Sequence, residues 1–149
     1  MKKSTTELPQ TSDVRQPAIA ATHLLAAVFF VGMHNKHGMK PLDSQTMSGK
    51  MIDAVINELP FKCTKTNLSE VEYMPIDDEI EEDARLWHEK YQPQKNDVIV
   101  LLGNWTHKNF LKAGFKIVKL RHPASMMGYV NKEKYVLEAI DKIMKAART

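Results

Sequence analysis

Four short polar segments contain the side chains that could do chemistry in this chain. They follow apolar runs and read Gly32-Met33-His34-Asn35, Thr66-Asn67, Gly103-Asn104-Trp105 and His122-Pro123. Histidine exchanges a proton near neutral pH, and a carboxamide both donates and accepts hydrogen bonds. These segments form a candidate site if the fold brings them together.

Metal and phosphate chemistry are weakly supported. His34 and His37 are separated like a pair of metal ligands, but no third ligand has a suitable spacing. Ser48-Gly49-Lys50 lacks the glycine-rich loop of a phosphate-binding motif and predicts the start of a helix. The single Cys63 excludes an internal disulfide and cannot alone assemble a zinc or iron–sulfur site. We therefore expect no metal, no cofactor and a reducing, cytoplasmic location.

The apolar pattern predicts strands that alternate with helices. We expect strands at residues 28–31, 61–68, 97–102 and 115–120, and helices at 47–59, 77–91, 105–113 and 131–147. The continuous aliphatic run in residues 97–102 indicates a sheet that is covered on both faces. Alternation of strands and helices implies crossover connections. The sequence therefore predicts an α/β fold, a three-layer α/β/α sandwich with a central four-stranded parallel sheet.

Length and composition are typical of one globular domain. The chain has 149 residues, of which 43% are hydrophobic and 26% charged. Residues 1–17 are polar and contain two prolines, so we expect a flexible tail followed by a single domain at 18–149. The most apolar run, residues 18–31, is interrupted by His23 and is short for a membrane span. We expect a monomer that has no membrane partner.

The charge is unevenly distributed. Residues 70–89 contain nine acids and one base, which leaves 20 basic and 9 acidic residues in the rest of the chain. A basic surface away from the acidic segment would suit a polyanion such as nucleic acid. Such surfaces also keep proteins soluble, so both interpretations stay open.

The sheet would gather the polar segments at one edge. In open parallel sheets ligands bind beyond the carboxyl ends of the strands, and each polar segment follows an expected strand. Purely structural roles stay open as well, because Asn67 could satisfy backbone groups at its strand end and His122 could lie in a surface turn. Trp105 could pack on the sheet or line a pocket.

The order of these segments resembles the uracil-DNA glycosylase superfamily, particularly its thermostable iron–sulfur branch, over roughly residues 26–145. The segments similar to its motifs are Gly32-Met33-His34-Asn35, Lys40-Pro41-Leu42, Ser48-Gly49-Lys50-Met51-Ile52-Asp53, Thr66-Asn67-Leu68, residues 98–103 and His122-Pro123-Ala124. No single one is specific, whereas their order and spacing are more so. The resemblance implies a uracil-DNA glycosylase-like domain whose residues 34, 67 and 122 converge on a slot for one pyrimidine.

The resemblance implies a role for each segment. Asn67 would read a uracil flipped out of DNA, by donating to O4 and accepting from N3–H. His122 would donate to O2 as negative charge grows on the departing base. Gly32 and Met33 would face the base, and Leu42 would cover it where the branch has an aromatic ring.

The resemblance also implies that the segment at residues 123–128 binds DNA. By the resemblance it is the loop pressed into the minor groove, which makes Ser125, Met126, Met127 and Gly128 the DNA-binding candidates, with Met126 or Met127 as an apolar wedge. The implied partner is uracil-containing DNA, and free uracil is a second candidate ligand.

The chain departs from the family at the first motif and at the cluster. Active families have an acid or an asparagine shortly after the glycine of the first motif. This chain has no acid there, so His34 and Asn35 are the catalytic candidates. Asp43, further along the loop, is a candidate substitute for the acid. The cluster-binding cysteines are missing, so no iron–sulfur centre is expected. Two main functions stay open: a DNA N-glycosylase, or a catalytically weak or inactive nucleic-acid or nucleobase-binding protein of the same fold. A nucleotide-binding module of another kind is disfavoured because no glycine-rich phosphate loop is present.

Overall fold

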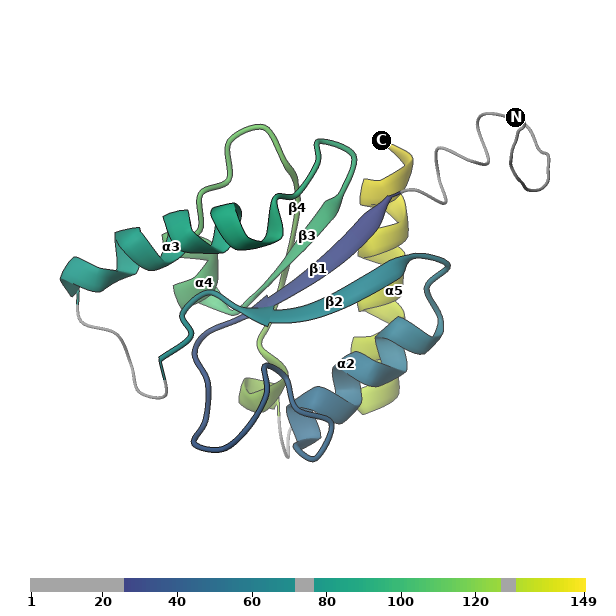
Figure 1. The fold of residues 1–149 in the computed structure, drawn as a ribbon. Coiled ribbons are helices and arrows are strands. Elements are labelled where there is room, and N and C mark those ends of the chain that lie inside the picture. The colour runs from purple at the N-terminus through teal and green to yellow at the C-terminus, as the bar shows by residue number, and fades with distance from the viewer. Residues whose placement is uncertain (1–25, 72–76, 127–130) are drawn as a thin grey trace, which may run out of the picture.

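A computed structural model of the chain describes residues 26–71, 77–126 and 131–149 and shows a parallel sheet with helices on both faces (Figure 1). The strands are β1 (Ala27–Gly32), β2 (Lys62–Asn67), β3 (Val98–Leu102) and β4 (Lys116–Leu120). The helices are α2 (Met47–Asn57), α3 (Asp77–Tyr91), α4 (Asn104–Asn109), the short 3-10 helix η1 (Pro123–Met126) and α5 (Lys132–Arg148). The strand order is β2-β1-β3-β4, and every neighbouring pair is parallel. The predicted α/β class and four-stranded parallel sheet are confirmed.

Alternate residues of the central strands fill two separate cores. Val28 and Phe30 of β1 point to the face covered by α2 and α5, where Ile52 and Ile143 pack on them. Phe29 points to the opposite face, which α3 and α4 cover (Figure 1). All five residues of β3 are buried, as their continuous aliphatic character predicts. The sheet is therefore covered on both faces.

A buried hydroxyl ties α3 to the sheet. Thr66, the penultimate residue of β2, is fully buried and donates to the Phe30 carbonyl at 2.9 Å. Its oxygen accepts from the indole Nε1 of Trp87 at 2.8 Å. Because Trp87 lies on α3, this bond fixes how the helix lies over the carboxyl end of β2.

Two helices end earlier than the sequence predicts. The helix expected at 47–59 ends at Asn57, because the residue before Pro60 is disfavoured in helical conformation. The helix expected at 105–113 ends at Asn109. Phe110 instead takes an extended conformation and buries its ring against Trp87, with ring centroids 5.0 Å apart.

Asp97 stands before β3 rather than in it. Its Oδ1 accepts from the Ala27 amide at 2.9 Å, and its Oδ2 accepts from the Gln94 amide at 2.8 Å. The carboxylate thus joins the start of β1 to the turn that enters β3. The strand expected at 97–102 begins one residue later for this reason.

The expected tail at residues 1–17 and the start of the apolar run, residues 18–25, lie outside the described residues. Among the helices that the structure describes, none has the length and apolar character needed to cross a membrane.

Candidate functional site

A pocket of about 350 Å³ opens at the carboxyl ends of β1, β2 and β4. Its lining residues are Met33, His34, Lys36, Met39, Lys40, Leu42, Asp43, Thr46, Ser48, Asn67, His122 and Ala124. The structure thus brings His34, Asn67 and His122 to one pocket, although they come from three separate segments. The volume is in the range of pockets that bind small molecules.

Asn67 is held close to the backbone of β1. It is the last residue of β2, it lies opposite Gly32 in the parallel register, and its side chain is 6% exposed. A Cβ atom at Gly32 would collide with Asn67 Oδ1, so the glycine makes this approach possible. The Asn67 Nδ2 group donates to Asn35 Oδ1 at 2.7 Å.

The Asn35 side chain faces Asn67 and the backbone that follows β2. Its Nδ2 donates to the Glu70 carbonyl at 3.0 Å, and its backbone amide donates to the Val71 carbonyl at 3.1 Å. Asn35 is not among the residues that line the pocket. Of the two catalytic candidates of the first motif, His34 therefore lines the pocket, whereas Asn35 contacts Asn67 from outside the pocket lining.

The tautomer of His34 follows from a backbone contact. Its Nδ1 lies 3.1 Å from the Asn35 carbonyl oxygen, which can only accept a hydrogen bond. Nδ1 therefore carries the proton, and in the neutral ring Nε2 carries the lone pair. Such a ring can accept a proton from a bound water.

His122 has the opposite tautomer. The Ala124 amide donates to His122 Nδ1 at 3.1 Å, so Nδ1 is the acceptor and the proton of the neutral ring is on Nε2. Burial lowers the pKa of His122 below its usual value, and the charge of Lys36 lowers it further. The half-buried ring is thus a neutral Nε2–H donor at pH 7.

Leu42 and Asp43 shape the loop between β1 and α2. Leu42 lines the pocket, is 8% exposed and has a φ of 50°, a region that non-glycine residues rarely occupy. The Asp43 carboxylate accepts from the Gln45 amide at 2.9 Å and the Lys40 amide at 3.2 Å. These two bonds lower the pKa of Asp43, which makes it a poor substitute for a water-activating base.

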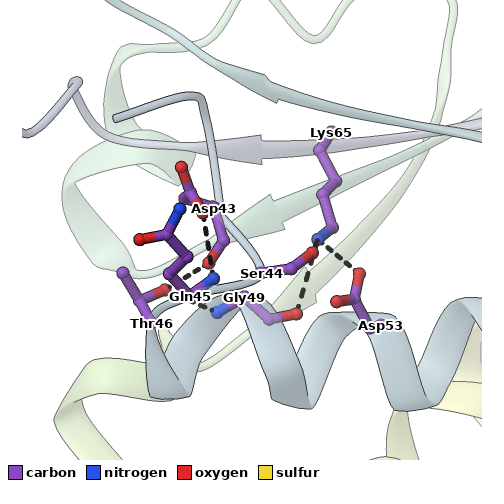
Figure 2. A network of polar contacts seen from close by, with 7 residues as sticks. All are labelled: Asp43, Ser44, Gln45, Thr46, Gly49, Asp53 and Lys65. Carbon is purple, nitrogen blue, oxygen red and sulfur yellow. Dashed lines mark hydrogen bonds and ion pairs between the residues drawn. The ribbon is translucent and has the colours of Figure 1, made fainter. Parts of the chain in front are cut away.

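A network of polar contacts fixes this loop to the start of α2 (Figure 2). The Thr46 side chain caps the helix by accepting from the Gly49 amide at 2.9 Å. Lys65 of β2 forms an ion pair with Asp53 and donates to Ser44 Oγ at 3.0 Å. The segment at 48–50 therefore belongs to the first turn of α2, as its sequence predicts.

The sequence left several lining residues unidentified. Lys36, Met39 and Lys40 come from the loop that follows β1, and Thr46 and Ser48 from the start of α2. Lys40 and Ser48 belong to segments that resemble the family's motifs, whereas Lys36 and Met39 had no signal beyond their position in a loop after a strand. The two lysines make the wall of the pocket basic.

Other candidate residues have different positions. Trp105 is half-buried and packs on the core between the sheet and α3, away from this pocket. Ser125 and Met126 are the last two residues of η1, and the structure describes only their backbone. Met127 and Gly128 lie outside the described residues. Among the residues that the structure describes, no three His, Cys, Asp or Glu side chains are placed to hold a metal ion.

No family model matches the sequence, and neither does any curated protein. The arrangement itself therefore carries the functional argument. It combines a fixed carboxamide, a histidine that can donate and a histidine that can accept, on one pocket with a basic wall.

Proposed function

We propose that this protein is a divergent uracil-DNA glycosylase-like enzyme, which hydrolyses the N-glycosidic bond of a uracil flipped out of DNA. The observation that carries the proposal is that His34, Asn67 and His122 line one pocket, with the two histidines in opposite tautomers. Base flipping delivers a single base to a pocket of this kind.

Asn67 reads the base in this proposal. A carboxamide pairs with the uracil edge by accepting from N3–H and donating to O4. Cytosine presents an acceptor at N3 and a donor at N4, so the same amide rejects it. Met33 and Leu42, which line the pocket, cover the ring.

The two histidines divide the chemistry. The bond between C1′ and N1 breaks with its electron pair going to the base, and His122 Nε2–H stabilises the charge that develops at O2. A water oxygen bonds to C1′ while His34 Nε2 takes its proton. The uracil anion leaves and is protonated by solvent.

The surroundings of the pocket suit a nucleic acid. Lys36 and Lys40 line it and attract the phosphates on either side of the flipped nucleotide. The segment that includes Ser125, Met126, Met127 and Gly128 follows His122 directly, so it would meet the duplex beside the gap left by the base.

A binding function without hydrolysis is the second candidate. The observation that favours it concerns Asp43, whose carboxylate accepts hydrogen bonds from two backbone amides. These bonds lower its pKa, so Asp43 is a poor base for activating water. The pocket then has His34 as its only candidate base among the described lining residues. A nucleobase or nucleic-acid binder would need the same reader and the same basic wall.

A uracil-release assay tests the proposal. We expect the wild-type protein to release uracil from single- or double-stranded DNA, and His122→Ala to lower the rate by about 10²–10³-fold, as when one donor to a developing anion is removed. Asn67→Ala removes the reader and lowers the rate as well.

The control is His107→Ala, which removes a histidine outside the pocket and leaves the rate unchanged. Wild-type release no greater than that of His122→Ala and Asn67→Ala refutes the catalytic function. Uracil-dependent binding without release supports the second candidate.

A further inference from the structure

The orientation of the Asn67 amide is dictated by a backbone carbonyl. The Glu70 carbonyl can only accept, so the group of Asn35 that lies 3.0 Å from it must be Nδ2. The other end of the Asn35 amide, Oδ1, then faces Asn67. Because Oδ1 can only accept, Asn67 must present Nδ2 to it, as the bond of 2.7 Å shows.

The carbonyl oxygen of Asn67 is consequently at the end of the amide away from Asn35, next to Gly32. The space that Gly32 leaves open is bounded by Asn67 Oδ1 and by Leu42 Cδ2, 3.5 Å from the position of a Cβ there. Asn67 and Leu42 both line the pocket. The acceptor end of the amide thus lies near Leu42, a residue that lines the pocket.

Packing alone would leave this orientation undetermined. Asn67 stands between the pocket and a second cavity of about 350 Å³, which Trp87 and Leu86 of α3 help to line. A half turn of an amide exchanges two groups of nearly equal size, so shape distinguishes the two orientations poorly. The hydrogen bond that Asn67 Nδ2 donates to Asn35 Oδ1 supplies the difference.

We propose that Asn35 is a positioning residue that sets the base selectivity of the pocket, by locking the Asn67 amide with its acceptor toward the ligand. This inference rests on the proposed function. An amide free to turn could read cytosine by donating to N3 and accepting from N4–H, whereas the locked amide reads only a ring N–H beside a carbonyl, as in uracil. Asn35 thus acts through Asn67 and not on the reacting atoms.

Titrations of the full-length protein with free uracil and free cytosine, followed by nuclear magnetic resonance, test this role. We expect the wild type to bind uracil about tenfold or more tightly than cytosine, because the loss of one hydrogen bond changes an affinity by about this factor. Asn35→Leu, which keeps the shape and removes both hydrogen bonds, should bring the two affinities within about threefold of each other. Asn35→Asp keeps an acceptor facing Asn67 and should retain most of the preference.

The side-chain amide resonances of Asn67, assigned with Asn67→Ala, report the orientation directly. One Nδ2 proton should show the downfield shift of a hydrogen bond in the wild type and in Asn35→Asp, and lose it in Asn35→Leu. Asn57→Leu makes the same change at an exposed position on α2 and should alter neither readout.

The outcomes distinguish the positioning role from the proposed function. If the wild type prefers uracil and Asn35→Leu prefers it equally, the positioning role is overturned while the proposed function stands. If the wild type binds neither base, the proposed function falls and the selectivity role falls with it. Loss of preference in Asn35→Leu together with its retention in Asn35→Asp supports the positioning role.

Discussion

Replacing Gly32 by alanine should push the Asn67 amide out of place. Gly32 has an ordinary backbone conformation, so alanine adds no backbone strain there. Its Cβ would overlap Asn67 Oδ1, whereas the next nearest atoms, Leu42 Cδ2 at 3.5 Å and Asn67 Cγ at 3.6 Å, lie at normal contact distance. The amide must therefore turn and break its 2.7 Å bond to Asn35.

The size of the effect follows from two opposing terms. A buried polar group that loses its partner costs about 1–3 kcal/mol. A change from glycine to alanine stabilises by about 0.4–1 kcal/mol through the unfolded chain. We expect the free energy of unfolding to fall by about 1–2 kcal/mol and uracil binding to weaken by at least roughly tenfold, because the acceptor is displaced.

Urea denaturation followed by tryptophan fluorescence measures the first quantity, and a uracil titration measures the second. Gly114→Ala is the control, because its Cβ meets nothing within 4 Å and its φ of 80° makes alanine cost about 1 kcal/mol in strain. The control should lose stability but keep its uracil affinity. A Gly32→Ala protein as stable as the wild type would show that this contact does not constrain Asn67.

Three further changes test the site and its support. The pKa of His122 lies below its usual value near 6.5, so the folded state binds this proton less readily than the unfolded state, and stability falls as the pH drops below about 6.5 toward the lowered pKa. Lys36→Gln removes a repelling charge and should raise the midpoint of His122 in a magnetic resonance titration; an unchanged midpoint would exclude the lysine as a cause. Thr66→Val should lower the free energy of unfolding by about 1–3 kcal/mol, because the indole of Trp87 loses its acceptor, and wild-type stability in urea would contradict this. Gly49→Ala should cost about 1–3 kcal/mol in the same measurement, since its Cβ would overlap the backbone of the preceding loop, and an unaltered urea midpoint would disprove that packing.

The strands were predictable because their chemistry is local. The aliphatic residues of β3 have no role except burial, and the structure buries all five. Helix α5 lies within one residue of the range expected at 131–147, and Val136 and Ile140 pack on the core while staying partly exposed. The fully or nearly buried residues are Tyr135, Ala139 and Ile143. Tyr135 is buried because its hydroxyl donates to the Arg121 carbonyl at 2.7 Å, a contact between segments that periodicity does not reveal.

The meeting of His34, Asn67 and His122 was predictable for a different reason. A parallel sheet places the carboxyl ends of its strands at one edge, so residues that follow the strands become neighbours. The position of Asn35 was not predictable in this way. Its partners are the Asn67 side chain and the Glu70 carbonyl, and only the folded course of the chain after β2 brings them within reach.

A crystal structure of the protein with uracil bound would show whether the pocket holds the base as proposed. We expect the base to lie in the 350 Å³ pocket with N3–H within hydrogen-bond distance of Asn67 Oδ1 and O2 facing His122 Nε2. Uracil bound elsewhere on the molecule, or bound in the pocket with its N3–H turned away from Asn67, would contradict it.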